Sequence, residues 1–203
     1  MNARYLFDRI RGRATCVCGE GVSVRREARI VNLTGDSRRI HIGAHSIVRG
    51  ELLTFSPEGS IELGEWCYVA EGARIWAAGT LRVGHRTLIA HNVTVVDSRT
   101  HSLDPAARHA HFRAIATLGH PANLDLGTKP VTIGDDVWIA AAVVILRGVT
   151  IGARTVVAAG SVLTRSVPSD CLVAGNPARI VRSLDRESGQ RDASSSAPGR
   201  DQS

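Results

Sequence analysis

The segment that decides the fold runs from Ile133 to Thr164 and reads IGDDVWIAAAVVILRGVTIGARTVVAAGSVLT. An aliphatic residue recurs in it at every sixth position and is followed by a mostly small residue, at Ile133-Gly134, Ile139-Ala140, Ile145-Leu146, Ile151-Gly152, Val157-Ala158 and Leu163-Thr164. This period fits neither the 3.6-residue turn of an α-helix nor the simple alternation of a strand. It predicts a short strand, a turn and a new strand on the next face of a three-sided prism, with about 18 residues to a coil.

Earlier copies of the pattern extend this prediction toward the N-terminus. They lie at Ile42-Gly43, Val48, Leu63-Gly64, Val69-Ala70, Ile75-Trp76, Val83-Gly84, Ile89-Ala90 and Val95-Val96. We therefore expect an all-β protein, a parallel β-helix whose coils stack ~4.8 Å apart and whose aliphatic residues point into a narrow interior. An aromatic content of only 4% agrees with such a thin core.

The repeat also sets the expected domain organisation. Residues 40–181 form the β-helix domain, interrupted by one long loop at residues 98–130. Residues 1–39 are a basic N-terminal section that leads into the first coils. Residues 182–203 are expected to form a short C-terminal helical segment and a disordered tail rich in Ser, Pro and Gly.

The long loop is the first candidate for function, because a structureless excursion of that length in a compact domain is usually functional. His101 lies at its root, and a neutral imidazole can remove a proton from a hydroxyl group at neutral pH. The loop is also too apolar to be freely solvated, so we expect it to pack on an adjacent subunit or back on its own coil. Its apolar residues are Leu103, Phe112, Ile115 and Leu118.

Three segments, in this order, resemble the hexapeptide-repeat acyltransferases, and among them the maltose and galactoside O-acetyltransferases. They are Thr100–Arg108 (THSLDPAAR), Lys129–Ile139 (KPVTIGDDVWI) and Gly175–Arg179 (GNPAR). The longer loop, with His109 to Phe112, and an N-terminal section without the helical pattern of the maltose enzymes are more similar to acetyltransferases encoded with surface-polysaccharide synthesis. The resemblance covers roughly residues 40–181.

This resemblance implies a left-handed β-helix and an acetyl-CoA-dependent O-acetyltransferase that acts on a sugar or a surface-polysaccharide precursor. It places the general base at His101, with direct transfer of the acetyl group, in a homotrimer with one active site at each interface. It also implies that coenzyme A is contacted by Ala141, Ala159, Thr164, Arg165, Arg179 and Arg182. Arginine suits the phosphates of that molecule, although Arg165 stands where the family usually has lysine.

Three further residues are candidates with two interpretations each. Asp97 either orients His101 or holds the acceptor; alternatively, stacking predicts a surface ion pair with Arg147. Glu71 is expected near the corner that holds His91, one coil lower, as a substrate-binding residue or a solvated carboxylate. Trp138 is too large for the interior and would form a wall of the groove beside the substrate or pack against a neighbouring subunit.

Composition narrows the class of protein. The formal net charge of +6 is concentrated in residues 1–50, with ten arginines against four acidic residues. That section fits an anionic membrane surface, a lipid-linked glycan or a phosphorylated ligand, or else an ordinary solvated face. We expect no nucleic-acid partner, because a recognition helix and an aromatic-studded basic groove are both missing from the pattern.

We also expect no membrane span and no metal. The longest apolar run, from Val137 to Ile151, is interrupted by Arg147. His85 and His91 are six positions apart, so they fall on consecutive faces and cannot converge on zinc. The four cysteines have neither a disulfide nor a zinc-ribbon spacing, which suits the reducing cytoplasm. The start of the chain gives no support for a secretory signal.

Two rival functions are also compatible with the sequence. The first is an N-acetyltransferase that uses the same fold and donor on an amino sugar. The second is a catalytically silent β-helix that serves as a scaffold.

Overall fold

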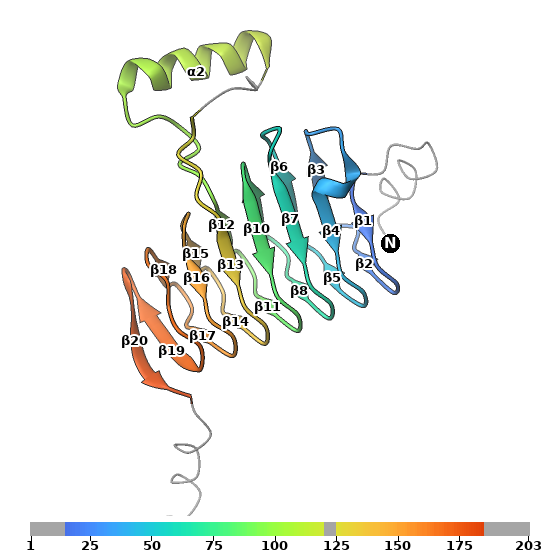
Figure 1. Ribbon diagram of the computed structural model, residues 1–203, viewed down its shortest axis with the longest axis vertical. Coiled ribbons are helices and arrows are strands. Elements are labelled where there is room, and N and C mark those ends of the chain that lie inside the picture. Colours follow the sequence, from blue (N-terminus) through green and yellow to red (C-terminus); the bar gives the residue numbers. More distant parts are fainter. Residues whose placement is uncertain (1–14, 120–124, 185–203) are drawn as a thin grey trace, which may run out of the picture.

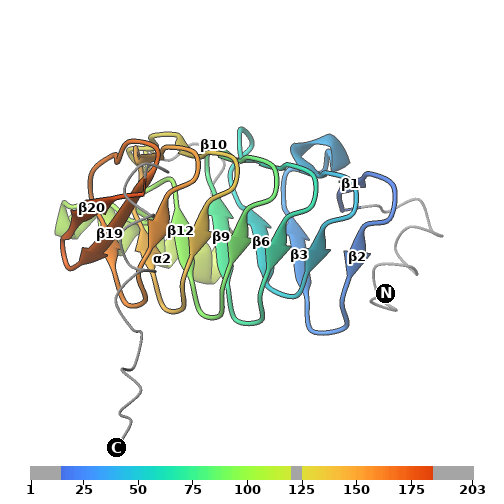
Figure 2. The same ribbon diagram turned by 90° about the horizontal axis from the view of Figure 1, so that it is seen from below.

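Each turn of the chain adds one short strand to each of three sheets, as Figure 1 shows. This arrangement comes from a computed structural model, which describes residues 15–119 and 125–184. Successive coils stack from the N-terminal β2 to the C-terminal β19–β20 hairpin (Figure 2). The sequence prediction of an all-β parallel helix is confirmed.

The three sheets are named A, B and C. Sheet A contains β1 (Val17–Cys18), β4 (Ile40–Ile42), β7 (Ser60–Leu63), β10 (Thr80–Val83), β13 (Val131–Ile133) and β16 (Thr150–Ile151). Sheet B contains β2 (Ser23–Val24), β5 (Ile47–Val48), β8 (Tyr68–Val69), β11 (Leu88–Ile89), β14 (Trp138–Ile139), β17 (Val156–Val157), β19 (Cys171–Gly175) and β20 (Ala178–Ser183). Sheet C contains β3 (Arg29–Asn32), β6 (Glu51–Thr54), β9 (Arg74–Ala77), β12 (Thr94–Val96), β15 (Val144–Ile145) and β18 (Val162–Leu163). All neighbours run parallel except β19 and β20.

The repeated aliphatic residues form the core. In sheet B, for example, Val69, Ile89 and Ile139 occupy equivalent positions in successive strands and are completely buried. Sheets A and C contribute similar inward columns through Ile133 and Ile145. Truncating such a residue to alanine costs about 2–5 kcal/mol, because no neighbouring layer can move in to fill the space.

The corner between sheets A and B, the A–B corner, is built from stacked glycines. A Cβ atom on Gly43 would lie 2.4 Å from the carbonyl carbon of Gly64, and one on Gly84 would lie 2.6 Å from that of Gly134. No side chain fits between backbones at that separation. The second residue of the six-residue repeat is small at this corner for that reason.

Besides the excursion, two parts of the described chain differ from the sequence prediction. A complete coil of β1, β2 and β3 precedes residue 40, so the stacked coils begin earlier than expected. Of the segment expected to be helical, only residues 182–184 are described, and residues 182 and 183 belong to β20 of the β19–β20 hairpin. The expected tail at residues 185–203, like residues 1–14 of the basic section, lies outside the described residues. No helix among the described residues is long and apolar enough to cross a membrane.

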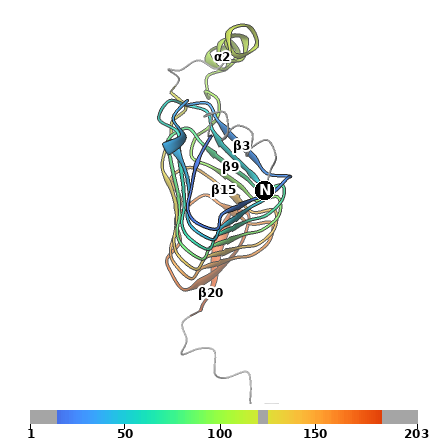
Figure 3. The ribbon, with the colours of Figure 1, turned by 90° about the vertical axis from the view of Figure 1, so that its right-hand side faces the viewer.

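The excursion between β12 and β13 contains a helix, α2 (Pro105–Leu118), where we expected a structureless loop. The Asp104 carboxylate accepts a hydrogen bond from the amide of Ala107 at 2.7 Å and caps the helix, and Pro105 is the first helical residue. Arg108 ties the helix back by donating to the carbonyls of Ser102 and Leu103. The helix stands outside the triangular cross-section of the prism (Figure 3).

Candidate functional site

The candidate base is held away from the prism on a short two-stranded stem. The excursion leaves at the corner between sheets C and A, the C–A corner. Its two arms are joined by hydrogen bonds from the amide of Lys129 to the carbonyl of Asp97 and from the amide of Arg99 to that of Leu126. Arg147 reinforces the stem by donating to the carbonyl of Gly127 at 2.9 Å. His101 follows the stem and has an exposed side chain.

The imidazole of His101 contacts a second imidazole, from His111 on α2. The two Nδ1 atoms are 3.4 Å apart, and the rings are tilted by 57° with centroids 5.2 Å apart. His111 is 6% exposed, so the inner ring is fixed by its surroundings while the outer ring faces solvent. One of the two Nδ1 atoms carries the hydrogen of this contact. When it is the Nδ1 of His101, the Nε2 of His101 has no hydrogen and can accept one.

Asp97 lies at the corner that we expected but has other partners than those predicted. Its carboxylate is fully buried and accepts hydrogen bonds from the amides of Ala78 and Gly79, both at 2.8 Å. Burial raises the pKa of Asp97, and these two amides only partly offset that effect. Asp97 contacts neither His101 nor Arg147 within the described structure, so it anchors the base of the stem to the preceding coil.

The other sequence-predicted residues fall into two lines at opposite edges of sheet C. Along the corner between sheets B and C, the B–C corner, stacked backbone bonds order Glu71, His91, Ala141 and Ala159, one above the other. Thr164 and Arg165 follow β18 at the C–A corner, on the same edge as the stem. About 20 Å separates the two lines, the length of a roughly six-residue extended segment across sheet C.

The last two predicted residues lie on the C-terminal hairpin. Arg179 and Arg182 are exposed on β20, opposite Ala174 and Leu172 of β19. The hairpin extends sheet B at the end of the prism (Figure 2). Both guanidinium groups are therefore available to an anion at that end.

Trp138 belongs to an apolar column on the outer face of sheet B. Equivalent positions of successive strands in this column, which we call the sheet B stripe, carry Ile47, Tyr68, Leu88, Trp138, Val156 and Leu172. Leu88 and Trp138 are 48% and 52% exposed. The matching outer column of sheet A is polar, with His41, Glu62, Arg82, Thr132 and Thr150. Only one of these two faces is suited to contact with another apolar surface.

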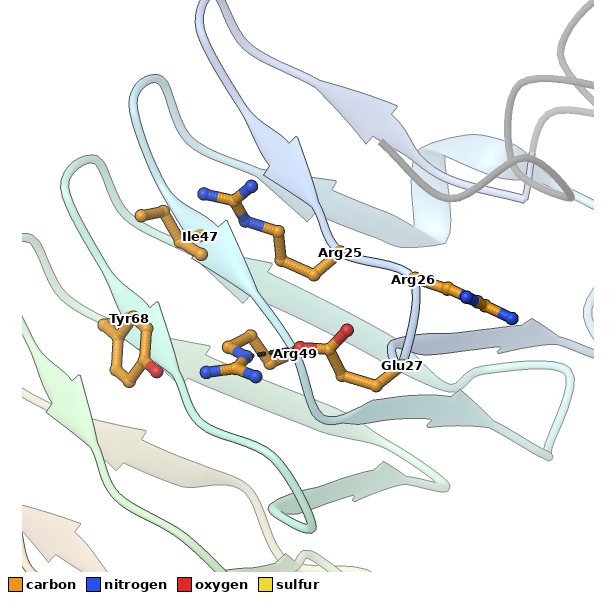
Figure 4. Close-up of a pocket in the computed structure, with 6 residues that line it drawn as sticks. All are labelled: Arg25, Arg26, Glu27, Ile47, Arg49 and Tyr68. Carbon is orange, nitrogen blue, oxygen red and sulfur yellow. Dashed lines mark hydrogen bonds and ion pairs between the residues drawn. The ribbon is translucent and has the colours of Figure 1, made fainter.

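A pocket of about 460 Å³ lies over the first coils, at the N-terminal end of the sheet B stripe. We call it the arginine pocket; its lining residues, drawn in Figure 4, are Arg25, Arg26, Glu27, Ile47, Arg49 and Tyr68. Arg49 donates to the Glu27 carboxylate, and to Glu71 at 3.5 Å. A backbone hydrogen bond and the Arg49 guanidinium lower the pKa of Glu27.

Glu71, a residue singled out from the sequence, contacts Arg49 of this pocket, but neither the pocket itself nor the contact of His111 was predicted. The arginines could be counted, but their convergence depends on which coils stack, and the contact of His111 depends on the unexpected helix. Within residues 15–119 and 125–184, no group of three or more His, Cys, Asp or Glu side chains could hold a metal ion.

Comparisons with known proteins identify the repeat. Residues 130–165 match the sequence model described as bacterial transferase hexapeptide (six repeats). A solved hexapeptide-repeat acetyltransferase of Vibrio cholerae, in complex with acetyl coenzyme A, is 30% identical. That match covers 89% of this chain and 76% of the Vibrio chain, with a TM-score of 0.56. The left-handed form of the β-helix, implied above by the resemblance, is supported by this repeat and neighbour.

Two relatives of known sequence are also similar. Galactoside O-acetyltransferase of Escherichia coli K12 is 31% identical over 128 residues, which are 60% of this chain and 63% of that enzyme. The putative colanic acid biosynthesis acetyltransferase WcaF of the same organism is 28% identical over 70% of this chain and 68% of its own. The chain thus spans less than two thirds of the galactoside enzyme's length.

Proposed function

The chain belongs to the hexapeptide-repeat transferase family, and from this membership we propose that it is an acetyl-CoA-dependent O-acetyltransferase acting on a sugar hydroxyl group. The observation that carries the proposal is the exposed imidazole of His101, fixed on its stem against His111. The similarity to WcaF favours a precursor of a surface polysaccharide as the acceptor.

The proposed mechanism is direct transfer with His101 as general base. With its Nδ1–H donated to His111, the Nε2 of His101 accepts the proton of the sugar hydroxyl group. The sugar oxygen then bonds to the thioester carbonyl carbon, the carbon–sulfur bond breaks, and the proton passes from Nε2 to the departing thiolate. His111 is a positioning residue in this scheme, because it fixes the ring of the base without touching the substrate.

The donor residues fit an extended substrate along the B–C corner. The small side chains of Ala141 and Ala159 let a pantetheine arm approach the backbone closely. Arg165, Arg179 and Arg182 would pair with its phosphates. A single chain, however, keeps His101 and Arg165 at one edge of sheet C and the two alanines at the other.

A homotrimer would bring these two edges together. Two exposed apolar surfaces support this trimer. One is the sheet B stripe. The other is formed by apolar residues of the excursion, Leu103, Phe112 and Leu118, which are 73%, 60% and 88% exposed. Packing α2 and its stem against a neighbouring copy would cover both surfaces and set His101 of one subunit beside Ala141 of the next. We also infer a cytoplasmic enzyme, because the spacing of the four cysteines is not that of a disulfide framework.

The test combines acetyl-CoA with a panel of sugars and measures the release of free thiol. We expect His101→Ala to lower kcat by ~10² to 10⁴, the range for the loss of a general base, while calorimetry gives an unchanged Kd for acetyl-CoA. His109→Ala is the matched control, since His109 is exposed on the same helix.

Three outcomes would each contradict a different part of this proposal. Full activity of folded His101→Ala would remove the general-base assignment. No binding of acetyl-CoA by the wild type would favour the scaffold. Faster turnover of glucosamine than of glucose, with N-acetylated product, would favour the N-acetyltransferase.

A further inference from the structure

We propose that the arginine pocket is the acceptor subsite and that it selects a sugar bearing a negative charge, either a carboxylate or a phosphate. This inference rests on the proposed function, which makes the acceptor a sugar. The preference of the pocket for charged over neutral sugars can nevertheless be measured by binding alone, without any transfer reaction.

The position of the pocket is the first argument. The same ladder of backbone bonds that orders the B–C corner continues into the pocket: the amide of Arg25 donates to Val48 and that of Arg49 to Val69. Three coils, or about 14 Å, separate Arg49 from the coil of Ala141. That interval leaves room for one sugar ring and a thioester, with Glu71 and His91 in the coils between.

The charge of the pocket is the second argument. Three guanidinium groups line it with only one carboxylate, that of Glu27. Glu27 and Glu71 both approach Arg49, whereas Arg25 forms no ion pair within the described residues. Figure 4 shows Arg26 pointing away from the other lining side chains, and Arg49 is paired with two carboxylates, so Arg25 is the guanidinium group left to meet a ligand.

The remaining wall is suited to a sugar ring. Tyr68 and Ile47 provide an apolar surface for the C–H face of a pyranose, and the phenol can hydrogen-bond to a hydroxyl group. Guanidinium groups bind carboxylates and phosphates through paired hydrogen bonds, which a neutral hydroxyl group cannot match. Arg25 is exposed and already lowers the pKa of Glu27 by its charge, but it has no ion-pair partner within the described residues, so an anionic acceptor can gain a contact there that a neutral one cannot.

The test measures equilibrium binding of three related probes in the absence of acetyl-CoA: methyl glucuronoside, glucose 1-phosphate and methyl glucoside. We expect the wild type to bind at least one anionic probe about tenfold more tightly than the neutral one, and the preferred probe identifies the anion. Arg25→Gln should weaken that probe about tenfold and leave methyl glucoside unchanged. Glu27→Gln should tighten it, because Arg49 is released.

Arg38→Gln is the control, since Arg38 is an exposed arginine paired with Asp36 outside the pocket. Equal binding of the three probes, absence of binding by both anionic probes, or the same loss in Arg38→Gln would overturn the inference. Calorimetry with acetyl-CoA on the same samples reports separately on the proposed function, so the two can fail independently.

Discussion

In the proposed mechanism His111 sets which nitrogen of His101 bears hydrogen, with the Nδ1 of His111 as acceptor of the contact at 3.4 Å. An acceptor at that position favours the tautomer with Nδ1–H and a basic Nε2. Leucine at position 111 would remove the acceptor, whereas the amide oxygen of asparagine could replace it.

We therefore expect His111→Leu to lower kcat at least tenfold with an unchanged KM for acetyl-CoA, and His111→Asn to recover most of the loss. Nitrogen-15 spectra of the histidine rings provide a readout independent of turnover, in which His101 should carry Nδ1–H in the wild type and lose that preference in His111→Leu. Wild-type kcat in the leucine variant, with the same tautomer, would contradict the positioning role.

Asp97 predicts a pH dependence of stability. Its folded pKa is raised above 3.8 by burial, so its contribution to stability is fully present below the unfolded pKa and is lost as pH rises through the folded value. Asp97→Asn cannot ionise and lacks this dependence. Urea unfolding of both proteins at a series of pH values should show the wild type losing stability relative to the variant as pH rises from about 3.8. Parallel curves would mean that the carboxyl group is not desolvated.

Among the elements, helix α2 and its stem project from the prism, so we expect that they can be replaced without unfolding the coils. Replacing residues 106–123 with a short Gly-Ser linker should leave the β-helix folded and acetyl-CoA bound, because the core lies entirely inside the prism. Acceptor transfer should be lost, or hydrolysis of the thioester should rise, since the replacement removes His111 and the apolar residues of α2 that we propose to pack on the neighbouring subunit. The exposed substitution Arg113→Ala is the control. Unchanged acceptor kinetics after the replacement would exclude the excursion from the site.

The sequence predicted the limits of this excursion but not its helix. The interruption of the repeat is a plain signal, because every strand must supply an inward aliphatic residue at a fixed interval. Asp104 followed by Pro105 is a helix-start signal that was available. The contact between His101 and His111 could not be predicted, because it depends on the angle between stem and helix, which no repeat determines.

For the whole molecule, the sheet B stripe predicts assembly. Leu88→Glu puts a charge in the middle of the apolar column and should convert the oligomer to monomers in analytical ultracentrifugation. Thr150→Glu on the polar face of sheet A is the matched control and should not. A wild type that is already monomeric, or dissociation in both variants, would remove the trimer from the proposal.

The positions of the candidate residues were predicted better than their contacts. A period of six fixes which corner each residue occupies, so the stacking of Ala141 with Ala159 and of Glu71 with His91 followed from counting. The hydrogen-bond partners of Asp97 did not follow from this counting. Stacking correctly set it beside the coil of Arg147, but its side chain turns toward the preceding coil, where two amides are available to a buried carboxylate.

The stacked glycines of the A–B corner restrict where the chain can change in length. Four residues connect the strands at this corner in every coil from β1–β2 to β16–β17, because backbone rests directly on backbone there. At the C–A corner the connection grows from Ala78–Gly79 to the whole excursion at 97–130. At the B–C corner the connection varies only between two residues, at β5–β6, and four. We therefore expect changes in chain length to be excluded at the A–B corner and to be accommodated best at the C–A corner, where the excursion could lengthen or shorten without moving the stacked glycines.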